Sequence, residues 1–341
     1  MNLATPRTFN FRAWNGLLAR LAVDQANAPL GRLAQSVLVP AAALLVFLML
    51  WAVGAQQVET SLGQLPGPAK VWEQAVALYG EHKDERAKEA AFNERMQKRL
   101  DKAVAAGKPQ AYLDKIEARR YTGVPTFFDQ ILTSLVTVAT GFLLGSIIAI
   151  PIGILCGMSP TTYQALNPII QLFKPVSPLA WLPLVTMVVS ALYVSSEPLF
   201  QKSFLTSAIT VTLCCLWPTV INTTVGVSSV SKDLLNVSRV LRLNWFTKTV
   251  KIIVPSAMPM MFTGLRLSLG IGWMVLIAAE MLAQNPGLGK FVWDEFQNGS
   301  SNSLARIMVA VLVIGFIGFV LDRGMLTLQR AVSWDKNAVL R

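Results

Sequence analysis

Charged residues are scarce in this 341-residue chain, and cysteine and histidine are scarcer still. Only 14% of its residues are Asp, Glu, Lys or Arg, against about 25% in an average soluble domain. With 53% hydrophobic residues, this deficit excludes a single soluble core and a disordered tail protein, and it indicates a membrane protein. The three cysteines exclude a disulfide-rich secreted scaffold. His82, the only histidine, lies among charged residues and is predicted to be a solvated helix residue.

The charges that are present are unevenly placed. Residues 55–126 hold 22 of the 49 charges, 12 basic and 10 acidic. This distribution predicts a membrane protein with one nearly neutral, water-soluble insertion. The net charge of +11 comes from short segments beside apolar runs, which is typical of membrane topology and not of a nucleic-acid-binding face.

Charge-free stretches predict six membrane-spanning helices, because about 20 apolar residues are needed to cross a bilayer. The short loops are basic on one side: residues 1–34 have a net charge of +3 and residues 226–251 a net charge of +4. This bias places both termini and the loop after the fourth helix in the cytoplasm, and the insertion outside. The six helices are predicted at residues 36–54, 128–156, 167–192, 204–225, 260–282 and 303–321.

The predicted organisation is that of an all-α polytopic membrane protein. A cleaved signal peptide is the alternative for the first helix, but the leader before its apolar run is too long. Helices at 81–106 and 110–120, broken at Gly107-Lys108-Pro109, predict a helical hairpin that either decorates the outer surface or docks a substrate-binding protein. The segments are a cytoplasmic N-terminal segment (1–34), transmembrane helix 1 (35–55), a periplasmic helical insertion (56–126), a core with helices 2–6 (127–330) and a cytoplasmic tail (331–341).

The segment 231–259 carries a further pattern. Leu234, Val237 and Leu241 are apolar residues at helical spacing among basic ones, and the chain returns to the bilayer at Val254-Pro255. Topology alone also explains an isolated basic loop. The order of features, however, resembles the cytoplasmic coupling motif of bacterial ABC importer permeases, in which a Glu-Ala-Ala triplet precedes a glycine and then an apolar-Pro pair. Residues 236–238 stand at the triplet, and Arg242 stands at the glycine.

Further motifs in the same order strengthen this resemblance. Together they resemble type I, binding-protein-dependent permeases of the nitrate, bicarbonate, taurine and sulfonate branch, and most closely the nitrate type. The resemblance covers most of residues 62–330, apart from the insertion. The motifs are residues 65–68 (LPGP), 71–72 (VW), 174–183 (KPVSPLAWLP), 240–243 (VLRL), 264–270 (GLRLSLG), 272–273 (GW), 279–282 (AEML) and 286–289 (PGLG).

The resemblance implies a fold, partners and a coupling segment. The fold would be the six-helix type I ABC importer permease, with an extra outer hairpin between helices 1 and 2. The implied partners are two ABC ATP-binding subunits, identical or different, a second copy of this chain, a periplasmic substrate-binding protein or domain, and an inorganic anion. ATP and Mg would be held by the partner subunits, with no cofactor on this chain. Residues 232–245 would form the coupling helix, with Asp233, Asn236, Ser238, Arg239, Leu241, Arg242 and Leu243 at the ATPase.

Three charged residues lie within or beside the predicted spans. An ionisable group there costs about 2.5 to 3.5 kcal/mol and normally faces protein or a water-filled cavity, so Lys174, Arg266 and Glu280 are candidates for an anion route. Arg266 and Glu280 share a helix face and could line one wall. Ser177 and Trp181 could add a hydroxyl donor and a wall. In the alternative, Arg266 and Lys174 snorkel to the interface, and Glu280 binds backbone or Lys290.

These patterns predict the transmembrane permease subunit of an ATP-driven importer for a small inorganic oxyanion, with nitrate first and nitrite, cyanate or bicarbonate next. The chain has no ATPase motif of its own, so it is not expected to be an enzyme. A taurine or sulfonate importer permease is one alternative. An ATPase-independent secondary carrier would need internal repeats and more intramembrane acids. A non-transporting scaffold leaves the coupling segment unexplained.

Overall fold

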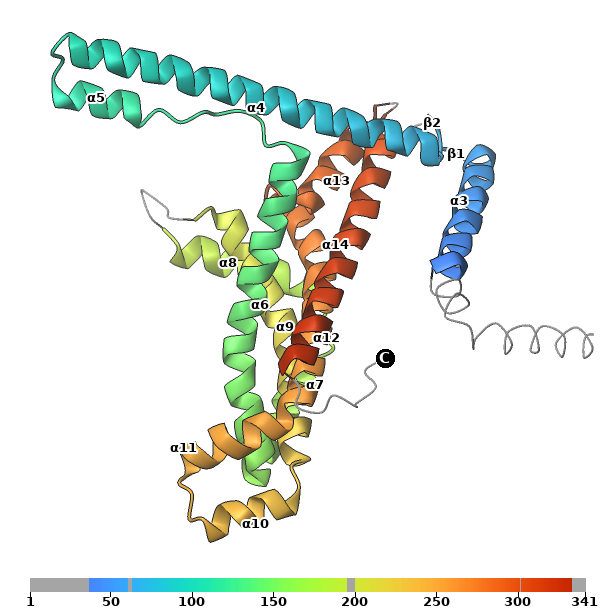
Figure 1. Cartoon of the computed structure of the whole chain (residues 1–341), viewed down its shortest axis with the longest axis vertical. Coiled ribbons are helices and arrows are strands. Elements are labelled where there is room, and N and C mark those ends of the chain that lie inside the picture. The colour runs from blue at the N-terminus through green and yellow to red at the C-terminus, as the bar shows by residue number, and fades with distance from the viewer. Residues whose placement is uncertain (1–36, 61–62, 195–199, 301, 333–341) are drawn as a thin grey trace, which may run out of the picture. The chain divides into compact units, whose positions relative to one another are not determined.

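The computed structural model describes residues 37–60, 63–194, 200–300 and 302–332, and it is almost entirely helical (Figure 1). The predicted segment 1–34 and residues 333–341 of the predicted tail lie outside these residues. The chain divides into two units, residues 1–70 and 71–341, which are described separately. In chain order the elements are α3 (Val39–Gln57), β1 (Glu59–Thr60), β2 (Gly63–Gln64), α4 (Pro68–Ala105), α5 (Gln110–Glu117), α6 (Phe127–Met158), α7 (Pro160–Phe173), α8 (Pro178–Leu192), α9 (Lys202–Ser228), α10 (Lys232–Val240), α11 (Trp245–Lys248), the π-helix η2 (Thr249–Ile253), α12 (Val254–Ala283), α13 (Leu288–Asn298) and α14 (Ser303–Val332).

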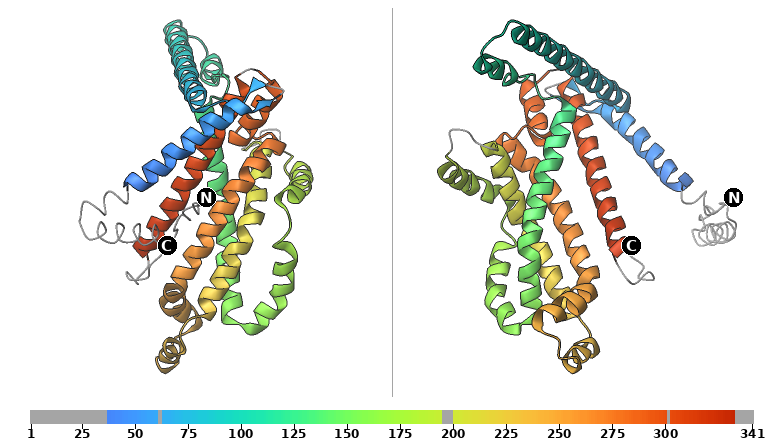
Figure 2. Two further views of the ribbon diagram at one scale, coloured as in Figure 1. Left: turned by 90° about the vertical axis from the view of Figure 1, so that its right-hand side faces the viewer. Right: turned by 60° about the vertical axis from the view of Figure 1, so that its left-hand side comes forward.

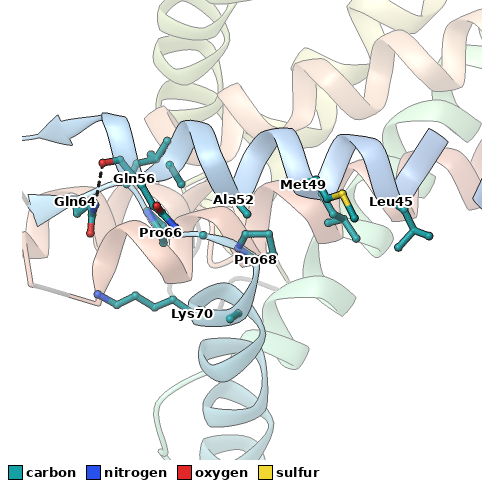
Figure 3. Close-up of a pocket in the computed structure, with 13 residues that line it drawn as sticks. Leu45, Met49, Ala52, Gln56, Gln64, Pro66, Pro68 and Lys70 are labelled. Atoms are coloured by element: carbon teal, nitrogen blue, oxygen red, sulfur yellow. Dashed lines mark hydrogen bonds between the residues drawn. The ribbon is translucent and has the colours of Figure 1, made fainter. Parts of the chain in front are cut away.

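The first unit contains α3 and a two-residue antiparallel ladder in which Glu59 pairs with Gln64. Most side chains of α3 are exposed within this unit, because no second helix packs along it. Gln64 Nε2 donates a hydrogen bond of 3.1 Å to the Gln56 carbonyl oxygen. A pocket of about 560 Å³ lies beside this contact, between α3 and the Pro-rich turn into α4 (Figure 3).

The core of the second unit is built on α6, α9 and α12, with α9 against both of the others (Figures 1 and 2). Small residues allow this close approach. A Cβ at Gly141 of α6 would lie 2.7 Å from the Ala208 carbonyl oxygen of α9. Threonine hydroxyls add hydrogen bonds at the same places: Thr212 Oγ1 donates to the Gly141 carbonyl oxygen at 3.1 Å, and Thr224 Oγ1 donates to that of Gly153 at 3.3 Å. Helices in lipid associate through small residues and interhelical hydrogen bonds of this kind.

The close approach at Gly141 yields a stability prediction. We expect Gly141→Ala to lower the melting temperature of the purified chain by several degrees, because overpacking costs about 1 to 3 kcal/mol. Gly270→Ala in α12 is the matched control, since a Cβ there meets no described atom within 4 Å. Equal melting temperatures for the two variants would show that the α6–α9 contact is looser than described.

The third predicted helix, 167–192, is not continuous. It consists of α7, which begins earlier, and α8, and the two are bent by 99° at the break. Pro175 and Pro178 lie at this break, where proline removes backbone donors and cannot continue a helix. Among the described residues, five helices are long and apolar enough to span a membrane, or six if α7 and α8 form one bent span. The predicted count of six depends on that bent pair.

Two other predicted helices have different bounds. The fifth begins at Val254 instead of 260, and the sixth continues to Val332 instead of ending at 321. The extension of α14 places Asp322 and Arg323, which lie beyond the predicted end of the sixth helix, inside the helix. Asp322 has a partner there, described below.

The predicted hairpin is present, but its first helix is longer than expected. α4 begins at Pro68 instead of 81 and runs for 38 residues across the ends of α6 and α14 (Figure 1). The Arg306 guanidinium of α14 lies 2.8 Å from the Glu81 carboxylate of α4, and Arg86 Nη2 of α4 lies 3.0 Å from Asp129 Oδ2 of α6. These ion pairs attach the proximal half of α4 to the spanning helices.

His82 is not the solvated residue that its neighbours predict. Its Nδ1 lies 2.7 Å from Thr126 Oγ1, and its ring packs 5.0 Å from that of Phe128. Nearby, Tyr121 donates a hydrogen bond of 2.7 Å to Glu85, which lowers the pKa of the Glu85 carboxyl and raises the pKa of the tyrosine. The connection from α5 to α6 is therefore fixed on α4 by polar contacts.

Candidate functional site

A pocket of about 480 Å³ lies at the break between α7 and α8. It brings together three of the five residues that the sequence assigned to an anion route, Lys174, Ser177 and Trp181. The break itself positions them, because Lys174 follows the end of α7 and Ser177 is the residue before α8. The remaining lining residues come from the break, α8, α9 and α12: Pro175, Val176, Pro178, Cys214, Trp217, Pro218, Ile221, Asn222, Leu267 and Ile271.

The polar groups of this pocket are mainly hydrogen-bond donors. Lys174 supplies the positive charge, Ser177 a hydroxyl group, and Trp181 and Trp217 carry indole N–H groups, while no Asp or Glu of the described residues lines the pocket. Both indole nitrogens are buried and have no hydrogen-bond partner among the described residues. Because these nitrogens are closed off from solvent, the positive charge of Lys174 is the feature of the pocket that would attract a small anion. The arrangement suits a small anion.

Aromatic packing fixes the two indoles. The Phe173 ring stacks on that of Trp217 at 6.1 Å and 8°, and it lies 5.6 Å from that of Trp181. Asn222 also lines the pocket, although its Nδ2 already donates to the Pro218 carbonyl oxygen at 2.8 Å. The sequence interpretation missed Trp217 and Asn222. The α9 residues in the wall are three or four positions apart, so they share one face of the helix. This spacing could have predicted Trp217 and Asn222 if one wall residue of α9 had been known; the α9 residues are 214, 217, 218, 221 and 222.

Arg266 and Glu280 do not line this pocket, and they do not share a wall. Arg266 Nη2 donates to Asp322 Oδ2 of α14 at 2.8 Å, and Nε donates to the other carboxylate oxygen. The ion pair joins α12 to α14. Asp322 was missed because the predicted sixth helix stopped one residue before it. The neighbouring Leu267, not Arg266, reaches the pocket.

Glu280 is completely buried in a hydrogen-bonded network between α6, α12 and α13. Ser134 Oγ of α6 lies 2.9 and 2.8 Å from its two carboxylate oxygens, and the Gly289 backbone N–H donates to it at 3.0 Å. The Leu288 N–H in turn donates to Ser134 Oγ at 2.8 Å. Gly287 leaves no space for a side chain, since a Cβ there would lie 2.1 Å from the carboxylate. Glu280 therefore caps the first turn of α13, as the backbone alternative anticipated. Lys290, the other partner considered for it, pairs with Asp294.

A second candidate site is the segment from α10 to α11, at the end of the bundle opposite α4 (Figure 1). Its large apolar side chains are exposed: Val240 is 83% exposed, Leu241 62% and Phe246 68%. Ser238 is instead buried, and its hydroxyl donates to the Leu235 carbonyl oxygen at 2.6 Å. Contiguous exposed apolar residues in this number are typical of an interaction surface.

The predicted coupling helix 232–245 is shorter than expected, because α10 ends at Val240. Arg242 has a φ of +48°, which is the left-handed conformation. Its N–H donates to the Arg239 carbonyl oxygen, and the Leu243 N–H donates to that of Ser238, both at 3.0 Å. This is a Schellman ending, in which glycine is usual at the left-handed position. The resembled motif has glycine at the position of Arg242. The left-handed backbone conformation at this position is a physical reason for that glycine.

Arg242 provides a local stability prediction. A non-glycine residue in this conformation costs roughly 1 kcal/mol relative to glycine, so Arg242→Gly is expected to slow hydrogen exchange of the Leu243 amide about fivefold. Arg239→Gly is the matched control, because the same change inside α10 should speed that exchange. Faster exchange in Arg242→Gly would mean that the arginine side chain, and not the backbone, holds the turn.

The comparisons with known proteins agree with the fold and its motifs. Residues 149–334 match the family described as binding-protein-dependent transport system inner membrane component. The chain belongs to this family, which confirms the predicted resemblance, and it is a multi-pass membrane protein. Its helices follow the fold of a chain of the inward-facing MetNI methionine ABC transporter, with a TM-score of 0.52 and 13% identity, over 60% of this chain and 95% of that one.

Two relatives come from the branch that the motifs indicated. The nitrate import permease protein NrtB of Leptolyngbya laminosa is 37% identical over 57% of this chain and 65% of its own length. The bicarbonate transport system permease protein CmpB of a Synechocystis species is 40% identical over 60% of this chain and 69% of its own length. The chain thus spans about two thirds of the length of these relatives.

Proposed function

We propose that this chain is the membrane-spanning permease subunit of an ATP-driven importer of a small inorganic oxyanion, with nitrate first and nitrite, cyanate and bicarbonate next. The observation that carries this proposal is the pocket at the α7–α8 break, which is lined by Lys174 and Ser177 and by no carboxylate among the described residues. The similarity to nitrate and bicarbonate permeases supports it.

The polar groups of the wall favour nitrate over bicarbonate and taurine. Nitrate offers only acceptor oxygens, which match the N–H, O–H and ammonium groups of the pocket. Bicarbonate has the same planar shape but carries an O–H group, for which Ser177 Oγ and Asn222 Oδ1 are the only side-chain oxygen acceptors among the described lining residues. Taurine carries an ammonium group, for which the pocket has no carboxylate. Sites of this kind discriminate strongly when one ligand leaves a polar group unpaired.

The importer requires partners. We propose that α10 and the exposed apolar residues after it dock on one of two ATP-binding subunits, identical or different, which hold the ATP and Mg. The coupling residues Asp233, Asn236, Ser238, Arg239, Leu241, Arg242 and Leu243 all lie in or directly after α10. We therefore propose that the α10 end faces the cytoplasm, in agreement with the positive charge of the loop, and that the α4 end lies outside. A periplasmic substrate-binding protein or domain would deliver the anion to the α4 end.

A second copy of the chain would complete the route. One coupling segment engages one ATPase, whereas two must close together, so the proposed complex contains two permease chains. Leu267 and Ile271 line the pocket and remain exposed in the single chain, at 52% and 40%. A second copy packed on this face would close the open wall. Closure of the ATPases would then move the helices around the pocket and alternate its access.

Uptake by the assembled complex in vesicles tests this proposal. The chain is reconstituted with its candidate ATP-binding subunits and binding protein, and ATP-dependent entry of labelled nitrate is measured with bicarbonate or taurine as competitor. We expect nitrate uptake that excess bicarbonate inhibits weakly and taurine does not. Uptake without any ATP-binding subunit would favour the secondary carrier instead, and preferred taurine entry would reassign the substrate.

A further inference from the structure

The insertion is nearly neutral as a whole, but its charges are separated along the hairpin. Residues 71–91 carry five acidic and three basic residues, whereas residues 92–121 carry four acidic and eight basic ones. The acidic half contains the ion pairs to α6 and α14. The basic half makes no salt bridge to the spanning helices among the described residues.

A groove of about 460 Å³ lies between α4 and α5 in this basic half. Five of its ten lining residues are cationic and none is acidic. Within the described part of the chain, none of the five forms a salt bridge, whereas the nearby Glu94 is occupied by Lys98 and Asp101 by Gln97. Apolar and aromatic side chains complete the wall. The lining residues are Met96, Arg99, Lys102, Ala103, Ala106, Lys108, Tyr112, Lys115, Ile116 and Arg119.

The position of the groove indicates what lies next to it. α4 crosses the ends of α6 and α14, where Arg86 and Arg306 form their ion pairs, and from there it slopes outward toward the α5 end of the hairpin (Figures 1 and 2). From Arg86 to Ala105 the helix continues for about 29 Å beyond that attachment. The basic half therefore projects sideways past α6, above the membrane surface and not above its own bundle.

We propose that this groove binds the headgroups of anionic phospholipids in the leaflet at the α4 end of the spans. Phosphodiester oxygens match a set of cations without competing carboxylates, and clusters of four or more Lys and Arg beside a membrane are the usual form of such sites. Tyr112, half exposed, and Met96 provide the mixed polar and apolar contacts of a membrane interface. The acidic face of a protein partner is a different occupant, and the test separates the two.

Native mass spectrometry of the full chain from nanodiscs tests the proposal directly. The nanodiscs contain equal amounts of phosphatidylglycerol and phosphatidylcholine, and the ratio of the two lipids that stay bound is measured. We expect phosphatidylglycerol to be enriched severalfold. The triple variant Lys102→Gln, Lys115→Gln, Arg119→Gln should lose at least half of this enrichment. The variant Lys83→Gln, Arg95→Gln, Lys98→Gln removes the same charge from α4 outside the groove and should retain it.

Three outcomes would overturn the proposal. Lipid ratios near one in the unaltered chain would show that the groove has no headgroup selectivity. Equal losses in both triple variants would show that net charge, and not the groove, attracts the lipid. Unchanged lipid ratios, together with weaker binding of the substrate-binding protein by the groove variant alone, would assign the surface to a protein. A matching melting temperature for each variant confirms that the hairpin is folded, and added inorganic phosphate should not displace the lipid.

Discussion

Lys174→Ala is expected to lower ATP-dependent nitrate uptake about ten- to hundredfold. Within the part of the chain that the structure describes, Lys174 is the only cation lining the pocket, and the walls around it are largely apolar. A charge contact near a protein surface contributes up to about 4 kcal/mol at 4 Å, and a loss of 1.4 kcal/mol is a tenfold change. The measurement is initial uptake rate against nitrate concentration in reconstituted vesicles, where loss of the charge should mainly raise KM.

Two further variants separate charge from structure. Lys174→Arg keeps the charge and should retain a substantial part of the uptake. Trp217→Phe preserves the stacking on Phe173 but removes one indole N–H donor, so it should weaken uptake severalfold. Lys202→Ala at the start of α9 removes a lysine away from the pocket and should leave the kinetics unchanged. Unchanged KM and kcat in Lys174→Ala would show that the pocket is not part of the anion route.

The second large effect is expected at Glu280, and it is a loss of folded protein. Glu280→Ala leaves the Ser134 hydroxyl and the Gly289 N–H without their acceptor in a fully buried site. Each buried donor left without an acceptor costs about 1 to 3 kcal/mol. A loss of several kcal/mol in the free energy of unfolding corresponds to a melting temperature lower by about 10 °C or more. We also expect a poor yield of monodisperse protein in detergent.

Glu280→Gln distinguishes a structural role from a role in transport. The amide oxygen can still accept from the Gly289 N–H, so a smaller fall in melting temperature is expected. Uptake per folded complex should remain close to that of the unaltered chain, because Glu280 does not line the pocket. If Glu280→Gln has normal stability but abolishes uptake, Glu280 takes part in the anion route. Glu295→Gln in α13, a mostly buried carboxylate paired with Arg306, serves as the control for loss of a buried charge nearby.

Hydropathy and motifs predicted which segments span the membrane, but not which residues meet between them. Charge-free length is a property of one segment, so the spans, the hairpin and the basic coupling segment could be found from the sequence. The partner of Arg266 is 56 residues away and that of Glu280 is 146 residues away. An intramembrane charge indicates that a partner exists, whether it is substrate or protein. Only the packing of α12 against α6 and α14 shows that these two charges have protein partners.

The pocket was partly predictable for a different reason. Lys174, Ser177 and Trp181 are close in sequence and surround Pro175 and Pro178, where the chain breaks between α7 and α8. Trp217 and Asn222 come from α9, which carries no local signal except its helical spacing. The left-handed Arg242 also could not be foreseen, because a residue other than glycine gives no warning of a positive φ.

The hydrogen-bonded network around Glu280 has a consequence for biosynthesis. The ribosome completes Ser134 long before it makes Glu280, and the Gly289 N–H appears nine residues after the carboxylate that needs it. A nascent chain that stops between these two residues holds a membrane-embedded acid without its backbone donor. Because Glu280 and Gly289 are only nine residues apart and Ser134 is made much earlier, we expect the network to form only when α12 and α13 dock onto α6, as a late step of assembly.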